Sequence, residues 1–385
     1  MNGNVNMKMD RREFVGTVGA FALGSGLCAW AKEENSYSVS ILGDTHYDVA
    51  PPETYHAAYI REFKGKTVNQ WGFGEFPRNS RMWEGTCRRT LLASGRAVRK
   101  DCAFVYQAGD LIQGDCNDPG VHAKMLRDTV AYMKGAYPND LPFVTVCGNH
   151  DIRGGVRPEI QKGTCRAYEE TICSLMTREL GSRLCEPVRG TTFAFRQGPD
   201  LFVAVDFNGG AKSVPVLKRL LAVNHDVRYT FILIHGGVFP YDFWSRYFYL
   251  GDPKLDDVRR EVRAILARRN AIVLSGHTHH LELKEAKFPE GTIVEATVNT
   301  VDDHGNPAVP RRVREGVSTY GSDKAFLDRI ARGHELFAEY SPYMTRRYDA
   351  DALGHAILNV SDRGVTLDYY GHDALVPTTT FVLRA

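Results

Sequence analysis

Short apolar runs that end in polar side chains recur along the chain. Five such runs occur, at residues 37–46, 103–115, 141–151, 229–237 and 271–280. Each run is short and rich in β-branched or aromatic residues, which favours a buried strand over a helix. The pattern therefore predicts five buried strands, each with polar residues at its carboxyl end.

Helical periodicity is found between several of these runs. Three amphipathic helices are predicted, over residues 85–100, 122–137 and 255–270. Strands that alternate with helices are typical of βαβ units, and ligands bind such sheets at the carboxyl ends of the strands. The polar ends of the five runs are therefore expected to meet in one crevice.

Two further segments, 191–207 and 356–370, alternate apolar and polar residues around a turn sequence and predict antiparallel hairpins. Together with the parallel units they predict an α/β fold: two mixed β-sheets packed as a sandwich and flanked by helices. One domain is expected over residues 37–385, with long insertions at about 48–84 and 302–350. The second insertion contains one helix-like piece, at residues 323–340.

The first 31 residues have the features of an export signal. Arg11 and Arg12 precede an uncharged stretch of about fifteen residues, which is short for a membrane span, and residues 29–31 form a plausible cleavage site. The paired arginines resemble a twin-arginine signal and predict an exported, periplasmic protein. The alternatives are a general secretory signal, an uncleaved anchor or, less favoured, lipid attachment at Cys28.

The composition gives no indication of a charged-polymer partner. Lys and Arg number 48 and Asp and Glu number 46, so the net charge of +2 carries no nucleic-acid signature. No membrane span is expected after removal of the signal. Seven cysteines then remain, and Cys165, Cys173 and Cys185 could supply a disulfide in an oxidising compartment.

The polar ends of the five runs carry carboxylates, an amide and imidazoles, but no thiolate. The candidate residues are Asp44, His46, Asp110, Asn149, His150, His235, His277 and His279. This mixture suits Mn, Fe or Zn rather than calcium, which prefers oxygen ligands alone. Seven of these residues as ligands are too many for one tetrahedral zinc but suit two ions that share a carboxylate. Two such ions can hold a bridging hydroxide for attack at phosphorus.

In order along the chain, these blocks resemble the pattern of the calcineurin-like metallophosphoesterases. The family's blocks DxH, GD, GNH[DE], H and GHxH are matched by residues 44–46, 109–110, 148–151, 235 and 276–279. The resemblance implies a two-sheet sandwich flanked by helices and two divalent metal ions. It also implies hydrolysis of a phosphate monoester or diester by a metal-bridging hydroxide, with a small phosphorylated substrate as the partner.

The resemblance also assigns roles to single residues. One metal would be held by Asp44, His46 and His279, the other by Asn149, His235 and His277, and Asp110 would bridge the two. His150 would act as the general acid, and Asp151 would either orient His150 or cap the following turn. His280 falls outside the family pattern and is expected behind the ligands or at the surface.

Two departures from relatives narrow the class. Protein Ser/Thr phosphatases of the family have an Asp and an Arg shortly after GD, where this chain has Gln113 and Gly114. Purple acid phosphatases have Asp-x-Gly in the first block, where this chain has His46. Both departures argue against an assignment to these two branches.

Two aromatic and Arg-containing segments, 68–85 and 236–252, follow metal-bearing blocks. They are candidates for a substrate pocket lined by Trp71, Phe73, Arg78, Arg81, Phe239, Tyr241 and Trp244. Arg78 or Arg81 would then bind phosphate oxygens. The alternative is that these are long loops whose aromatic side chains pack on one another.

A serine hydrolase and a non-catalytic binding protein are the two alternatives to a metallophosphoesterase. A serine hydrolase is disfavoured because the chain has no G-x-S-x-G sequence. A binding protein that keeps the fold without catalysis is the remaining alternative. Its relatives usually lose metal ligands, whereas this chain has a donor residue at every expected position.

Overall fold

The computed structural model describes residues 35–67, 72–241, 248–301, 309–330 and 332–385. The chain divides into the units Met1–Glu34 and Asn35–Ala385, and the first of these lies outside the described residues. The signal peptide expected at residues 1–31, with Cys28, therefore remains a prediction. Among the described helices, none is long and apolar enough to cross a membrane.

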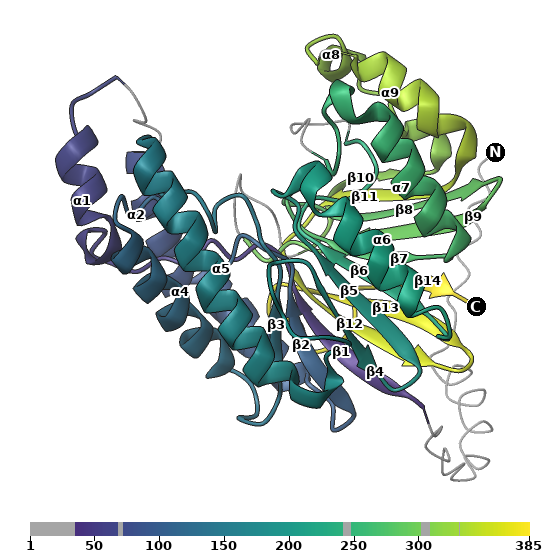
Figure 1. Cartoon of the computed structure of the whole chain (residues 1–385), viewed down its shortest axis with the longest axis horizontal. Coiled ribbons are helices and arrows are strands. Elements are labelled where there is room, and N and C mark those ends of the chain that lie inside the picture. The colour runs from purple at the N-terminus through teal and green to yellow at the C-terminus, as the bar shows by residue number, and fades with distance from the viewer. Residues whose placement is uncertain (1–34, 68–71, 242–247, 302–308, 331) are drawn as a thin grey trace, which may run out of the picture. The chain divides into compact units, whose positions relative to one another are not determined.

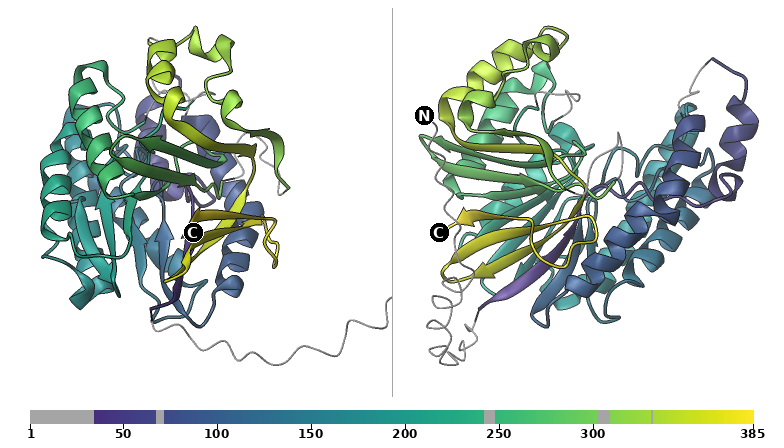
Figure 2. Two further views of the ribbon diagram at one scale, coloured as in Figure 1. Left: turned by 90° about the vertical axis from the view of Figure 1, so that its right-hand side faces the viewer. Right: turned by 180° about the vertical axis from the view of Figure 1, so that it is seen from behind.

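A six-stranded sheet contains the first three predicted strands. Its order is β14 (Thr379–Arg384), β13 (Gly364–Gly371), β12 (Gly354–Ser361), β1 (Tyr37–Leu42), β2 (Cys102–Gln107) and β3 (Phe143–Thr145). β1 pairs in parallel with β2 and antiparallel with β12, so the sheet is mixed. The first and last parts of the domain therefore lie side by side, as the purple and yellow strands of Figure 2 show.

An eight-stranded sheet contains the other two predicted strands. Its order is β10 (Arg311–Glu315), β11 (Met344–Asp351), β8 (Leu281–Phe288), β9 (Gly291–Thr297), β7 (Ile272–Ser275), β6 (Thr230–Ile234), β5 (Asp200–Val205) and β4 (Phe193–Gln197). β5, β6, β7 and β9 run parallel, and hairpin partners flank them on both sides. This sheet is therefore mixed as well.

The two sheets pack face to face over one apolar core. Phe104 of β2 contacts Phe202 of β5 with ring centroids 5.1 Å apart, and Phe202 stacks on Phe231 of β6. All three side chains are fully buried, as expected for strands that are apolar on both faces. The predicted sandwich of two mixed sheets is confirmed.

Helices cover the outer faces of both sheets (Figure 1). On the six-stranded side these are α3 (Thr86–Ala97), α4 (Pro119–Lys134) and α5 (Pro158–Leu180), while α6 (Val214–Val223) and α7 (Asp256–Arg268) cover the eight-stranded sheet. α7 has the apolar face expected from its periodicity, because Val262 and Leu266 are buried against that sheet. The three predicted helices are thus present, with ends that differ by a few residues.

The first predicted insertion is not a loop. It forms α1 (Glu53–Phe63) and α2 (Gly72–Glu84). Phe76, Ser80 and Trp83 are buried at helical spacing along α2. The glycines and the proline of this segment obscured that periodicity in the sequence.

The second predicted insertion contributes to the sheet as well as to its surroundings. Its last residues form β11, which pairs with β8. The helix expected at residues 323–340 is divided into α8 (Lys324–Leu327) and α9 (Gly333–Tyr340). Arg332 has a φ of 63° directly before Gly333, and this left-handed residue cannot continue the first helix. The single helix predicted here was wrong.

Cys165, Cys173 and Cys185 are free thiols. The disulfide that the sequence allowed among them is therefore not formed.

Candidate metal centre

The candidate side chains lie on loops that directly follow five strands. Asp44 and His46 follow β1, Asp110 follows β2, and the turn with Asn149 and His150 follows β3. On the second sheet, His235 follows β6, and His277 and His279 follow β7. Hydrogen bonds join these loops. The backbone N–H of His46 donates to the carbonyl of Asp110 within one sheet, and that of His277 donates to Asp44 Oδ1 between the two sheets. The carboxyl ends of both sheets thus meet at one site.

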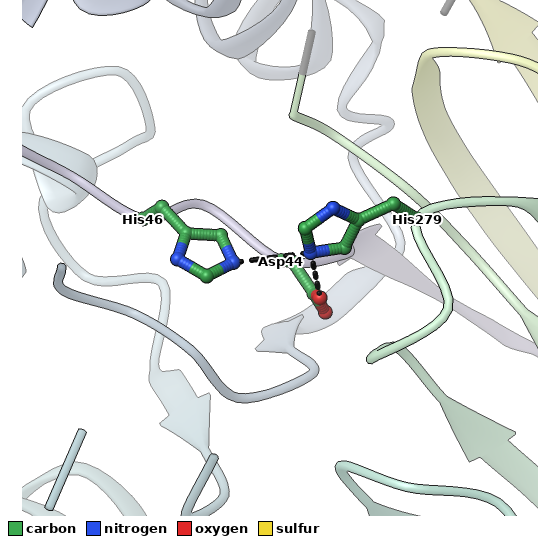
Figure 3. A group of neighbouring side chains, drawn as sticks. All are labelled: Asp44, His46 and His279. Atoms are coloured by element: carbon green, nitrogen blue, oxygen red, sulfur yellow. Dashed lines mark hydrogen bonds and ion pairs between the residues drawn. The ribbon is translucent and has the colours of Figure 1, made fainter. Parts of the chain in front are cut away.

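The first group of side chains is formed by Asp44, His46 and His279, whose candidate ligand atoms all lie within 4.8 Å of one another. His279 Nε2 is 2.9 Å from Asp44 Oδ2 and 3.1 Å from His46 Nε2 (Figure 3). All three residues are buried. This is the set that the sequence assigned to one metal.

The second group is formed by Asp110, His235 and His277, again within 4.8 Å of one another. His235 Nε2 is 3.3 Å from Asp110 Oδ2, 3.2 Å from His277 Nδ1 and 3.2 Å from Asn149 Oδ1. Asp110 Oδ2 is also 3.5 Å from His46 Nε2 of the first group. One oxygen atom of Asp110 therefore faces both groups.

The backbone at this site is unusual. His46, Asp110, His277 and His279 have positive φ angles of 40°, 49°, 71° and 54°. Such conformations cost a non-glycine residue about 1–3 kcal/mol and concentrate at functional sites, where the surrounding structure holds them. Four residues of the two groups are thus kept in strained geometry.

Two glycines allow the loops to approach one another. A Cβ atom on Gly276 would lie 2.2 Å from Asp44 Oδ1, and one on Gly148 would lie 2.2 Å from Asp110 Oδ1. Any side chain at either position would displace a carboxylate of the site. Steric crowding therefore explains why glycine occupies these positions of the GHxH and GNH blocks.

Burial and the charges of neighbouring side chains shift the pKa values of the residues in the site. Burial lowers the pKa of His235, but Asp110 and Asp44 outweigh burial and raise that pKa to about 9. Burial raises the pKa of Asp110, yet His235 and His150 hold it well below its usual value. Burial, followed by the charge of His235, lowers the pKa of His277 to about 3. One imidazolium is thus held between two carboxylates while a neighbouring imidazole stays neutral.

These residues fit divalent metal ions. His235 Nδ1 faces the carbonyl of Ala108 at 2.9 Å, so this nitrogen carries the proton of the neutral ring. The lone pair of Nε2 then faces Asp110 Oδ2, an arrangement that needs a cation or a further proton. Imidazole nitrogens, carboxylates and one amide oxygen are the donors that Mn, Fe or Zn prefers. The two groups therefore suit a binuclear metal site.

His150 lies beside the first group, with its ring centroid 4.3 Å from that of His46. Its Nδ1 is 3.1 Å from the carbonyl of Gln113, and its Nε2 is 3.1 Å from a guanidinium nitrogen of Arg153. Burial, followed by the positive charges of Arg153 and His46, holds the pKa of His150 well below its usual value. The ring is therefore neutral at pH 7.

Asp151 is fully buried. Its carboxylate accepts backbone N–H bonds from Gly148 (2.9 Å) and Ile112 (3.1 Å), and its pKa is raised to about 7, mainly by burial. These contacts hold the GNHD turn itself and join it to the loop after β2. The two roles expected from the sequence, orienting His150 or capping the following turn, stay predictions.

The aromatic and arginine residues that the sequence suggested for a substrate pocket lie in different parts of the structure. Arg78 and Arg81 lie on α2, where Arg81 is exposed and Arg78 contacts its neighbour Asn79. Phe73 packs in a small cluster within the first insertion. Tyr241 is buried, and its ring centroid lies 6.2 Å from that of His277. Trp71 and Trp244 lie outside the described residues.

Sequence reasoning missed three polar residues beside His150, namely Glu75, Gln113 and Arg153. Gln113 was noted only as a departure from relatives, and Arg153 lies two residues after the GNHD block. A search for charged residues next to that block would have found it. His280 is partly buried and contacts Asp349 at 2.8 Å, behind the ligand loop, in line with its expected place.

A comparison with protein families agrees with this fold. A family model described as calcineurin-like phosphoesterase matches residues 37–281. No curated protein sequence matches the chain.

Several solved structures are similar to this chain at low sequence identity. A structure titled "Structure of PhoD" is 12% identical over 91% of this chain and 69% of that chain, with a TM-score of 0.51. A purple acid phosphatase from yellow lupin (Lupinus luteus) seeds is 12% identical over 90% and 53%, with a TM-score of 0.48. A dimetal phosphatase from Danio rerio is 11% identical over 90% and 99%, with a TM-score of 0.46.

The fold and the site define the class as metallophosphoesterases, with two groups of ligand-type side chains at the carboxyl ends of two packed sheets. Because the family match covers more than half of the chain, the protein belongs to the calcineurin-like phosphoesterase family. It is therefore a hydrolase that acts on phosphoric ester bonds.

Proposed function

We propose that the protein hydrolyses small phosphate esters with two divalent metal ions, Mn, Fe or Zn. Asp44, His46 and His279 would hold one ion, and Asn149, His235 and His277 the other. The observation that supports this most strongly is the position of Asp110, whose Oδ2 faces both groups.

When bound, the ions would supply the positive charge that lowers the pKa of an attacking water and neutralises phosphate oxygens. The chain orients the bridging carboxylate for this task. The backbone N–H of His150 donates to Asp110 Oδ1 at 2.7 Å. This hydrogen bond fixes the carboxylate and leaves Oδ2 directed toward the two groups.

His150 would protonate the leaving oxygen. The bond from Nδ1 to the carbonyl of Gln113 fixes the tautomer, so Nε2 is the nitrogen that exchanges the proton. Because the ring is neutral at pH 7, its role as an acid needs the negative charge of a bound phosphate to raise its pKa. Asp151 would support this residue indirectly, through the turn that it holds.

The rival proposal is a binding protein with this fold and no catalysis. A protein of that kind has no need to keep four of the candidate ligands in strained backbone. The strain and the complete donor set favour the enzyme.

The test is hydrolysis of p-nitrophenyl phosphate and bis-p-nitrophenyl phosphate by the Mn-loaded protein. Asp110→Asn removes a charge from the bridge, and we expect the rate to fall at least about 100-fold, as for the loss of other catalytic electrostatic groups. Asp118→Asn is the control, since Asp118 caps α4 and asparagine caps equally well. A rate of Asp110→Asn within a few-fold of the wild type would refute the bridging role.

A further inference from the structure

A charged network lies beside His150, outside the candidate ligands. One terminal nitrogen of Arg153 is 3.1 Å from His150 Nε2. The other is 2.8 Å from Glu75 Oε2 and 2.6 Å from Asp115 Oδ2. The side chain of Arg153 is 20% exposed, so a solute can reach it, whereas that of Asp115 is only 4% exposed.

The backbone around Arg153 is fixed close to the Asp110 loop. Gly114 has a φ of 72°, and a Cβ atom there would lie 2.3 Å from the carbonyl oxygen of His150 and 2.7 Å from that of Arg153. The N–H of Asp115 donates to the carbonyl of Arg153 at 2.5 Å. The guanidinium is therefore held beside the site in advance of any ligand.

The first insertion reaches this network through α2. Glu75 Oε2 accepts from Gln113 Nε2 at 2.6 Å and from Arg153 at 2.8 Å. Gln113 in turn accepts from His150 through its carbonyl. Glu75 thus links the two residues that contact the ring nitrogens of His150, and its own side chain is only 22% exposed.

The acceptor that Arg153 has at His150 is a weak one. The guanidinium keeps its charge at all relevant pH values, and its hydrogen bond to a charged phosphate oxygen is stronger than one to a neutral ring nitrogen. A phosphate oxygen near His150 Nε2 would replace that nitrogen as the acceptor. The exchange would free Nε2 for the leaving group.

We infer that Arg153 binds a non-bridging oxygen of a phosphate monoester and that Glu75 is the positioning residue that holds Arg153 in place. The inference rests on the proposed function and deepens it. A monoester dianion carries one more charged oxygen than a diester. Although Glu75 and Asp115 balance its charge, Arg153 offers that oxygen a donor nitrogen outside the two metal groups. In a diester that oxygen carries a substituent, which would desolvate the guanidinium without pairing it.

The test compares Arg153→Met, Arg153→Lys and Glu75→Gln with the wild type, all loaded with Mn. Arg157→Met is the matched control, because Arg157 lies on the same segment, is half exposed and pairs with Glu62 at 3.0 Å. We expect kcat/KM for p-nitrophenyl phosphate to fall about 10- to 100-fold in Arg153→Met, the range for a hydrogen bond to a charged group. For bis-p-nitrophenyl phosphate we expect a fall of less than about 3-fold, so the ratio of the two rates changes.

The other variants separate binding from folding. Arg153→Lys keeps the charge and should recover part of the monoester rate, although lysine lacks the planar fork. Glu75→Gln should raise KM for the monoester more than it lowers kcat, with an unchanged melting temperature. If kcat/KM fell equally for both esters in Arg153→Met and Glu75→Gln, the inference would be overturned. It would also be overturned if Arg153→Met hydrolysed the monoester as fast as Arg157→Met does.

A binding measurement distinguishes this inference from the proposed function. Inorganic phosphate is titrated calorimetrically into the Mn-loaded proteins, and we expect its affinity to fall at least about 10-fold in Arg153→Met and not in Arg157→Met. A wild type that hydrolyses neither ester would contradict the proposed function, while phosphate binding would still test Arg153. Equal phosphate affinity in the two variants would contradict the role of Arg153 even if the wild type is active.

Discussion

At the scale of single residues, the site joins buried charge with strained backbone. Each of the two groups contains a carboxylate and at least one imidazole in the left-handed region. The four strained residues together cost about 4–12 kcal/mol, which tight packing and an added cation can offset. We regard this strain as the local signature of the metal site.

A histidine outside the two groups gives a test at the same scale. His355 on β12 is fully buried and stacks on Tyr370, and burial lowers its pKa to about 3. Among the described residues, neither of its ring nitrogens has a hydrogen-bond partner. On acidification, His355 is therefore protonated at a lower pH in the folded state than in the unfolded state, where the pKa of a histidine is about 6.5.

The contribution of His355 to the free energy of unfolding is complete above about pH 6.5 and is lost as the pH falls toward 3. Between pH 7 and pH 4.5 the loss is about 2–3 kcal/mol. We expect His355→Phe to reduce the acid destabilisation by this amount in urea unfolding at the two pH values. His225→Gln, at an exposed histidine, is the control, and equal acid destabilisation in His355→Phe and the wild type would show that this proton is unimportant.

At the scale of elements, α2 supports the site from the first insertion. Trp83 at its end is buried, and its indole N–H donates to the carbonyl of Thr45 at 2.8 Å. Thr45 lies between Asp44 and His46, so this hydrogen bond holds the loop of the first group. Outer partners of this kind orient the ligands of metal sites.

Trp83→Phe tests this support. The variant keeps an aromatic ring and loses the hydrogen bond to Thr45, and we expect the Mn affinity to fall about 10-fold with a small loss of stability. Tyr55→Phe is the control, because it removes one hydrogen bond of α1, to Asp128, away from the ligands. Metal titration followed by calorimetry measures both, and an affinity of Trp83→Phe equal to that of Tyr55→Phe would exclude a supporting role.

Most elements with one clear period were predicted from the sequence, and β8 is an exception. The five apolar runs predicted the strands that carry the candidate ligands. β8 was missed although Leu281, Glu282, Leu283 and Lys284 alternate as in a half-exposed strand. Its two charged side chains are in fact buried as an ion pair. A sequence pattern shows such residues as polar and therefore as exposed.

Helices were missed for a related reason. α5 carries charged residues on several sides and buries a narrow stripe that includes Tyr168, Ile172 and Leu175. Its start at Pro158 was the one available signal. The network of Glu75 and Arg153 could not be predicted either, since it depends on how α2 packs on a loop 78 residues away in sequence.

At the scale of the whole molecule, two sheets place the ends of five strands at one edge of the sandwich. Each sheet contributes ligands to the first group, since Asp44 and His46 follow β1 and His279 follows β7. The second group likewise combines Asp110 after β2 with His235 and His277. Neither sheet alone can form a complete group, so metal binding and the packing of the sheets depend on each other.

The proposed function requires these loops to bind two metal ions. Metal analysis of the purified wild type, loaded with Mn and freed of excess metal, measures this binding. We expect two ions per chain, together with a melting temperature that falls when a chelator removes them, because a ligand of the folded state stabilises it. Fewer than one ion per chain, with a melting temperature that the chelator does not change, would contradict the two-metal site.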